Sequence, residues 1–322
     1  MMQALKFYPI LKEKVWGGKK LKTVLNKSSD SDKIGESWEL SGLPGNISVV
    51  SEGEFKGQTL NHLISKYKDV LVGKRVFEKY GENFPLLIKF IDAADDLSVQ
   101  VHPNDETAQK LYGQNGKNEL WYIMDSDRNS ELILGLNKTL NTEEFRNSIN
   151  RNTLTENLNT VKIKKGDVYF IPAGRIHAIK KGVLLAEIQQ ASDMTYRIYD
   201  WNRKGLDGKY RKLHIDEACK VAELKTKKSY LTKYSEKINT FVQCVSNQYF
   251  SVNLLKFNTE IVKNYSETDS FIIFICTKGS FRLMYSKNEI KVSFGETVLL
   301  PAVIKKIKLI PDKESELLEV FI

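Results

Sequence analysis

The chain has 322 residues, of which 41% are hydrophobic and 28% are charged. This composition is typical of a folded protein in water with one large domain or two to three smaller ones, and no stretch approaches the roughly 18 apolar residues that a membrane span needs. The formal net charge is +9, but the lysines are scattered in short groups without interleaved aromatic residues. We therefore expect neither a membrane nor a nucleic-acid partner.

The N-terminal residues and the cysteines indicate a cytoplasmic protein. Charged side chains interrupt residues 1–20, which therefore lack the apolar core of a signal peptide. Cys219, Cys244 and Cys276 are odd in number, far apart and without CxxC spacing, so they predict no disulfide framework. The sequence predicts no particular oligomeric state.

Taken in chain order, short strands outnumber helices. Residues 59–73 carry apolar side chains at helical spacing and end on a glycine. Residues 141–149 begin with Asn141 and have Glu144 three positions later, which predicts a capped helix. Short apolar or alternating runs predict strands at 84–91, 97–102, 119–124, 167–173, 183–190 and 270–277. Many short strands in series favour a mainly β fold of jelly-roll barrels over a parallel α/β sheet.

Residues 97–102 alternate strictly between apolar and polar side chains. One parity holds Leu97, Val99 and Val101, and the other holds Ser98, Gln100 and His102. Such a strand has two unlike faces, so the polar side chains face either water or a barrel interior. In the second case, a glutamine oxygen and a histidine nitrogen two residues apart could bind one metal ion.

A weak internal repeat indicates two barrels. Residues 164–180 align without gaps on residues 293–309, and Lys306 in the second copy stands where the first has His177. Residues 222–240 are polar and rich in lysine. We therefore predict one barrel domain with helical insertions at 1–235 and a second, degenerate barrel domain at 236–322.

The first copy of the repeat also carries a metal-binding pattern. Gly166, Pro172, Gly174 and His177 have the spacing of the second signature of the cupin superfamily, downstream of the Gln-x-His strand. Glu119, in the stretch GKNELWYIM, lies in the sequence between the Gln-x-His strand and this signature. The four oxygen and nitrogen donors that could converge in one barrel are Gln100, His102, Glu119 and His177.

The whole set of motifs resembles the type I mannose-6-phosphate isomerase family, in its short bacterial branch. The motifs cover most of the chain: VWGG from Val15, GESWELSG from Gly35, FPLLIKFIDA from Phe84, LSVQVHPND from Leu97, GKNELWYI from Gly116, IPAGRIHAI from Ile171 and SDMTYRIYDW from Ser192. Some longer relatives have a tyrosine two residues after the final histidine ligand, where this chain has Ile179. Contacts of that hydroxyl are therefore not carried over.

The resemblance implies an isomerase of carbohydrate metabolism that interconverts mannose 6-phosphate and fructose 6-phosphate through an enediol. It implies one zinc ion per chain, bound by the four donors named above. It further implies a catalytic set of Arg197, Lys117, Glu187 and Asp193, with Ser98 and Lys89 binding the phosphorylated hexose. His62 and His214 are interpreted as surface or packing histidines.

Two other classes of function remain open from the sequence. A cupin oxygenase would share a metal site of two histidines and one carboxylate, but would have no use for Lys117 and Arg197. A sugar-sensing cupin without catalysis would be expected to lose metal ligands, as the second barrel is predicted to have done. The first barrel keeps all four, which favours the isomerase.

Overall fold

The computed structural model describes residues 2–322 and is mainly β. Its internal contacts divide the chain into two compact units. The first contains the chain up to residue 10 together with 39–87 and 233–322, and the second contains 11–38 and 88–232. The two units are thus interleaved along the sequence. The division into sequential domains at residue 235 stays a prediction.

Two sheets build most of the second unit. The larger has the order β1 (Ile10–Gly18), β2 (Ile34–Ser41), β3 (Leu86–Ala93), β10 (Val183–Gln190), β5 (Glu119–Ser126) and β8 (Val168–Ile171). The smaller has the order β11 (Tyr196–Tyr199), β4 (Val99–Val101), β9 (His177–Ile179), β6 (Glu131–Leu136) and β7 (Leu158–Lys162). Apolar side chains of both sheets, such as Trp121, Leu134 and Leu185, pack in one core.

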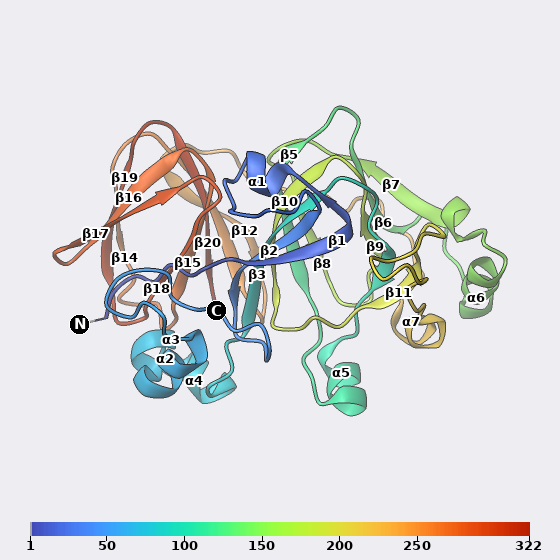
Figure 1. Cartoon of the computed structure of the whole chain (residues 1–322), viewed down its shortest axis with the longest axis horizontal. Helices are drawn as coiled ribbons and strands as arrows, with labels where there is room; N and C mark the ends of the chain where they lie inside the picture. The colour runs from blue at the N-terminus through green and yellow to red at the C-terminus, as the bar shows by residue number, and fades with distance from the viewer. Residues whose placement is uncertain (1) are drawn as a thin grey trace. The chain divides into compact units, whose positions relative to one another are not determined.

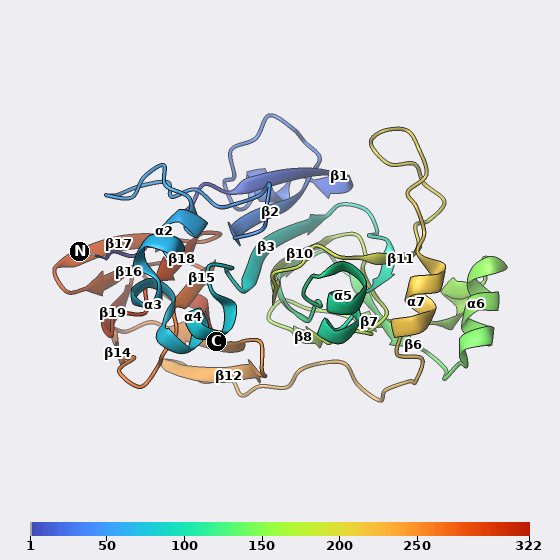
Figure 2. The same ribbon diagram turned by 90° about the horizontal axis from the view of Figure 1, so that it is seen from below.

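Helices cover the outer side of the smaller sheet. This unit contains α1 (Lys20–Thr23), α5 (Asp105–Tyr112), α6 (Thr142–Asn150), the 3₁₀ helix η1 (Leu154–Asn157) and α7 (Ile215–Val221). Val99 and Val101 of β4 pack with Phe145 of α6 and Ala218 of α7. Figures 1 and 2 together place α6 and α7 side by side, and α5 at one end of the unit. The apolar parity of β4 therefore faces helices, and its polar parity faces the other sheet.

The first unit contains a second pair of sheets. One has the order β12 (Thr240–Ser246), β13 (Ser251–Phe257), β20 (Ser315–Phe321), β15 (Ile272–Lys278) and β18 (Thr297–Leu300). The other has the order β14 (Ile261–Asn264), β19 (Lys306–Pro311), β16 (Ser280–Tyr285) and β17 (Asn288–Ser293), drawn in orange to red in Figure 1. Leu255, Leu283 and Leu317 bring both sheets into one core.

The helices of the first unit are α2 (Leu60–Tyr67), α3 (Asp69–Val72) and α4 (Lys74–Tyr80). The helix predicted at 59–73 is therefore present but broken. Lys68 has a positive φ of 46°, which is left-handed backbone that no helix continues through. The capped helix predicted at 141–149 is confirmed as α6, since the Asn141 side chain accepts from the Glu144 backbone N–H and the Glu144 carboxylate accepts from that of Asn141.

Strand register supports the internal repeat. In the second unit, Ile171 of β8 pairs with Glu119 of β5. In the first unit, Leu300 stands at the matching repeat position in β18 and pairs with Ile272 of β15. Ile272 thus occupies the place of Glu119. Lys306 likewise stands where the second unit has His177, at the start of the matching strand. The first unit therefore has neither a glutamate nor a histidine at the places equivalent to Glu119 and His177.

Among the described residues, the structure contains no helix that is both long and apolar enough to cross a membrane.

Candidate functional site

Strand β4 places the polar row of the Gln-x-His segment inside the second unit. Gln100 lies in register with Arg197 of β11 on one side and with His177 of β9 on the other. Ser98 and His102 are only 3% and 1% exposed. The interpretation that this face meets water is therefore wrong. Ser98 and Gln100 instead line a cavity of about 270 Å³ in this unit.

Three buried side chains of this row and its neighbours form a cluster that could hold a metal ion. The ligand atoms of His102, Glu119 and His177 all lie within 4.8 Å of one another. The Nε2 atoms of His102 and His177 are 3.5 Å and 3.3 Å from the two Glu119 oxygens. The Gln100 amide lies beside them, with its nitrogen 3.2 Å from His177 Nε2. The structure thus brings together all four predicted ligands.

Backbone contacts set which nitrogen of each histidine faces the cluster. His102 Nδ1 is 2.8 Å from the Met194 carbonyl oxygen, and His177 Nδ1 is 2.8 Å from that of Arg175. A carbonyl only accepts, so each Nδ1 carries the proton and each Nε2 presents a lone pair. Burial lowers the pKa of His102 and lowers that of His177 to about 3. Both rings are therefore neutral, as metal-binding histidines must be.

Glu119 is the clearest sign that a cation belongs here. It is fully buried, its Oε1 has no hydrogen-bond donor, and its Oε2 has only the Lys117 ammonium, 3.1 Å away. Burial raises the pKa of Glu119 to about 7, against the opposing effect of Lys117. A buried carboxylate oxygen without a donor is costly. A bound cation would satisfy it, so the residues present fit the metal that the sequence predicts.

Lysine–carboxylate pairs line one wall of the cavity. Lys89 is buried, with Nζ 3.2 Å from Glu187 Oε1. Burial would lower the pKa of Lys89, but Glu187 and Glu36 raise it. Burial likewise opposes the ionisation of Glu187, yet Lys89 and Lys117 lower its pKa. Both side chains are therefore charged, and the Lys89 ammonium already has a carboxylate partner.

Arg197 lies at another wall of the same cavity. Its Nε donates to Ser98 Oγ at 3.3 Å, and its Nη1 donates to the Lys212 carbonyl oxygen at 3.1 Å. Asp193 lines the cavity with it. All six residues predicted to act on substrate are thus near the cluster, and their roles stay predictions.

Lys14, Glu36, Arg211 and His214 also line the cavity, and sequence reasoning assigned none of them to the site. His214 Nδ1 accepts a hydrogen bond from the Arg197 backbone N–H at 3.2 Å. The interpretation of His214 as an ordinary surface or packing histidine is therefore incomplete. Neither Arg211 nor His214 belongs to a periodic segment or a motif, so the sequence held no signal for these two.

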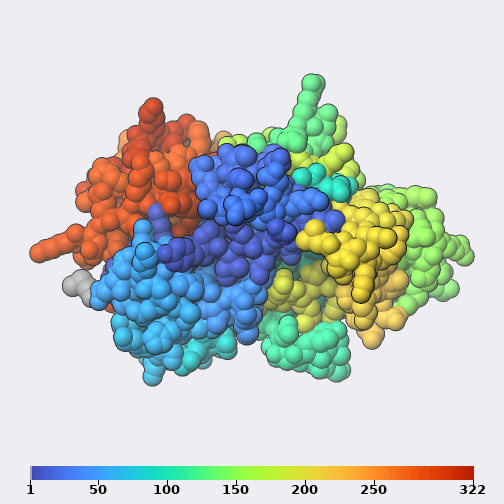
Figure 3. Space-filling view, in the orientation of Figure 1, coloured from blue at the N-terminus to red at the C-terminus, as the bar shows by residue number. Residues whose placement is uncertain are grey.

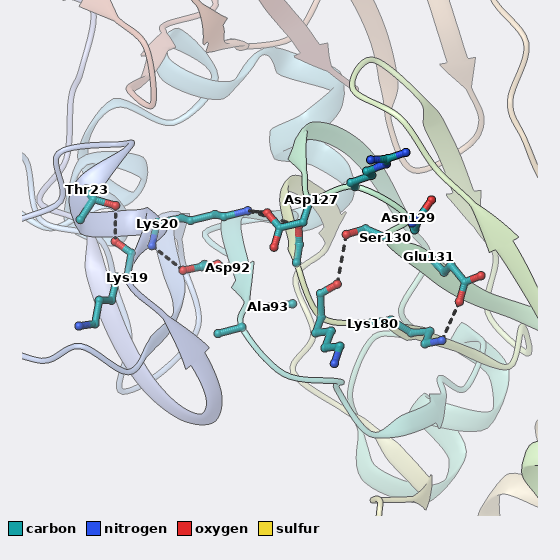
Figure 4. Close-up of a pocket in the computed structure, with 14 residues that line it drawn as sticks. Lys19, Lys20, Thr23, Asp92, Ala93, Asp127, Asn129, Ser130, Glu131 and Lys180 are labelled. Atoms are coloured by element: carbon teal, nitrogen blue, oxygen red, sulfur yellow. Dashed lines mark hydrogen bonds and ion pairs between the residues drawn. The ribbon is translucent and has the colours of Figure 1, made fainter.

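The second unit has a larger cavity elsewhere, of about 490 Å³, which Figure 4 shows. Its charged side chains largely neutralise one another. Lys20 donates to Asp127 and Lys180 donates to Glu131, each at 2.7 Å. The described residues include no other cluster of histidine, cysteine and carboxylate ligands comparable to that of Glu119. Size alone therefore does not identify the functional site, and the smaller cavity is the chemical candidate.

The mainly β fold with a buried His–Glu–His cluster defines a cupin-type protein, and comparisons with known proteins agree. The protein-family model "Phosphomannose isomerase type I, catalytic domain" matches residues 4–148, and the family model "Mannose-6-phosphate isomerase, cupin domain" matches residues 237–312. The mannose-6-phosphate isomerase ManA of Bacillus subtilis is 37% identical, over 95% of this chain and 96% of its own. The mannose-6-phosphate isomerase of Streptococcus mutans is 31% identical, over 91% of this chain and 90% of its own. The chain belongs to the type I phosphomannose isomerase family.

Solved structures support the same assignment. The crystal structure of the mannose 6-phosphate isomerase from Bacillus subtilis has a TM-score of 0.90 and 33% identity, and the match covers 100% of both chains. A phosphomannose isomerase variant from Salmonella typhimurium has a TM-score of 0.81 at 18% identity, over 99% of both chains. The second likeness supports the fold alone.

Proposed function

We propose that this enzyme interconverts mannose 6-phosphate and fructose 6-phosphate through an enediol intermediate. We also propose that Gln100, His102, Glu119 and His177 bind one zinc ion per chain. The observation that carries both proposals is the buried Glu119 carboxylate, which has two histidine Nε2 lone pairs beside it and only the Lys117 ammonium, 3.1 Å from one oxygen, as a donor. When bound, the metal would act as a Lewis acid that polarises the sugar oxygens.

The chain's own residues supply the proton chemistry in this proposal. The reaction moves a proton between C1 and C2, so it needs a base that reaches the sugar. Glu187 and Asp193 are the proposed carboxylates, since both line the cavity and lie outside the metal cluster. Lys117, whose Nζ is 3.3 Å from His102 Nε2, would stabilise negative charge on the enediolate. Arg197 would act on the phosphorylated sugar, because a guanidinium pairs well with phosphate.

The remaining features of this proposal concern the substrate and its setting. The proposed partner is a phosphorylated hexose, with Ser98 and Lys89 as contacts. A cytoplasmic location and a domain boundary after residue 235 are proposed on the sequence grounds given above. The cupin oxygenase is disfavoured, because it would leave Lys117 and Arg197 beside the metal cluster without a role. Oxygen consumption measured with an oxygen electrode would detect such an activity directly.

Proton exchange with solvent tests the enediol. With mannose 6-phosphate as substrate in D₂O, we expect deuterium at C1 of the fructose 6-phosphate formed, measured by NMR. Full turnover without any deuterium in product or recovered substrate would favour a hydride shift over an enediol. Absence of turnover with zinc supplied would contradict the proposed reaction itself.

A further inference from the structure

A hairpin in the second unit brings a second arginine to the candidate cavity. Residues 200–214 leave β11 and return to it, with a bridge between Lys204 and Tyr210 and a Gly205 N–H bond to the Lys209 carbonyl at 2.8 Å. At its end, the His214 N–H donates to the Arg197 carbonyl oxygen at 2.8 Å. Figure 3 shows this part of the chain, in yellow, on the surface. The return strand of the hairpin is therefore tied to Arg197.

A buried carboxylate holds the arginine of this hairpin. Asp200 is 7% exposed and accepts from both Nε and Nη2 of Arg211, the Nε bond being 2.6 Å long. Two parallel bonds of this kind fix a guanidinium in the plane of the carboxylate. Asp200 also accepts from Arg203 Nη2 at 3.4 Å. Only Arg211 of these two arginines lines the candidate cavity; both arginines and Asp200 also border a neighbouring groove.

The cavity lining carries more cations than carboxylates: Lys14, Lys89, Lys117, Arg197 and Arg211 against Glu36, Glu187 and Asp193. Each of the three lysines that line the cavity has a carboxylate about 3 Å away: Lys14 has Glu36 at 3.1 Å, Lys89 has Glu187 at 3.2 Å and Lys117 has Glu119 at 3.1 Å.

Arg197, by contrast, contacts a hydroxyl and a carbonyl, and the described residues offer it no ion-pair partner. Burial lowers its pKa, and Arg211 lowers it further through repulsion between the two positive charges. Two arginines thus line the cavity, and the carboxylate that binds Arg211, Asp200, is shared with Arg203 and makes no hydrogen bond to Arg197. An anion placed there would relieve the repulsion.

We propose that Arg211 binds the phosphate of the substrate together with Arg197, and that Asp200 is a positioning residue that fixes Arg211. Nε and Nη2 of Arg211 bind Asp200, and Nη1 has no partner among the described residues, so this nitrogen is available to phosphate oxygens. This inference rests on the proposed function. It assigns selectivity for a phosphorylated over an unphosphorylated sugar to a hairpin that neither matched family model covers.

Two arginine variants test the assignment, because both arginines contact Asp200 but only one lines the cavity. In Arg211→Met we expect kcat/KM for mannose 6-phosphate to fall roughly tenfold to hundredfold, since a charge-assisted hydrogen bond is worth about 1.5–3 kcal/mol. Inhibition by inorganic phosphate should weaken by a similar factor, with metal content unchanged. In the matched control, Arg203→Met, both values should stay within about twofold of the wild type.

The positioning role of Asp200 has its own readout. Asp200→Asn should keep one weaker acceptor for Arg211, so phosphate inhibition should weaken less than in Arg211→Met, and combining the two changes should add little. Arg211→Lys keeps the charge but not the planar fork, and should restore phosphate inhibition only in part. Equal effects of Arg203→Met and Arg211→Met would overturn the proposal and indicate a structural role for the whole cluster.

Direct calorimetric titration of the folded, metal-loaded protein with inorganic phosphate separates this inference from the proposed function. If the wild type isomerises mannose 6-phosphate but Arg211→Met binds phosphate equally well, the inference is wrong and the proposed function stands. If the wild type binds phosphate through Arg211 but has no isomerase activity, the proposed function is wrong and the anion site stands. Melting temperatures of all variants check that each one is folded.

Discussion

Replacing His177 by alanine should remove the metal without unfolding the protein. The ring is fully buried, its Nε2 lies 3.3 Å from Glu119, and it packs edge-on against Trp121 at 5.3 Å between ring centroids. Loss of an outer partner of a ligand already costs about 10–100-fold in metal affinity, so loss of a ligand should cost at least about 100-fold. The cavity left behind should cost about 2–5 kcal/mol of stability, as in other large-to-small core substitutions.

Three measurements separate these two effects. Metal content after dialysis reports on the ligand, a coupled assay for fructose 6-phosphate reports on turnover, and urea unfolding of the metal-free proteins reports on the cavity alone. His62→Ala is the matched control, because His62 is an exposed residue of α2 and such substitutions stay within about 0.5 kcal/mol. If His177→Ala kept full metal content and full turnover, the assignment of the cluster would be wrong.

The other predictions concern the first unit, the arginine and pH. Metal analysis should give one ion per chain, and a second tight ion that survives His102→Ala would contradict the degenerate second barrel. Arg197→Ala should cut kcat/KM by roughly 100-fold or more with zinc content and melting temperature nearly unchanged, and Arg197→Lys should recover little; unfolding of the alanine variant would instead make Arg197 structural. Burial opposes ionisation of Glu36, yet Lys89 and Lys14 lower its pKa from 4.5 to about 2. Its contribution to stability is therefore present above pH 4.5 and lost as pH falls towards 2, by about 3 kcal/mol in all. Urea unfolding between pH 5 and pH 3 should show a smaller decrease for Glu36→Gln than for the wild type, and equal decreases would contradict this cause.

The candidate metal cluster was predictable because it rests on local patterns. Alternation along 97–102 fixes which side chains share a face, and glycine–proline spacing fixes the turns before His177. The structure adds the register that brings these strands together, with Gln100 opposite His177. What the sequence left open was whether the polar face met water or a partner sheet. That depends on pairing between segments that are distant in the chain.

Some of the residues that sequence reasoning missed depend on irregular backbone. Arg211 reaches the cavity through a hairpin held by Asp200, and neither periodicity nor a motif encodes that path. The partner of Lys89 is equally hidden, since Glu187 lies on a strand 98 positions away in the chain. The break of the predicted helix at Lys68 reflects a positive φ in a residue that has no particular preference for it.

Turnover of mannose 6-phosphate before and after removal of metal tests the central claim most directly. We expect purified wild-type protein to form fructose 6-phosphate, to lose this activity on dialysis against a chelator, and to regain it with one equivalent of zinc. The Glu119→Gln variant should bind zinc weakly and regain little under the same conditions. Full activity of the wild type after its metal has been shown to be absent would contradict the account.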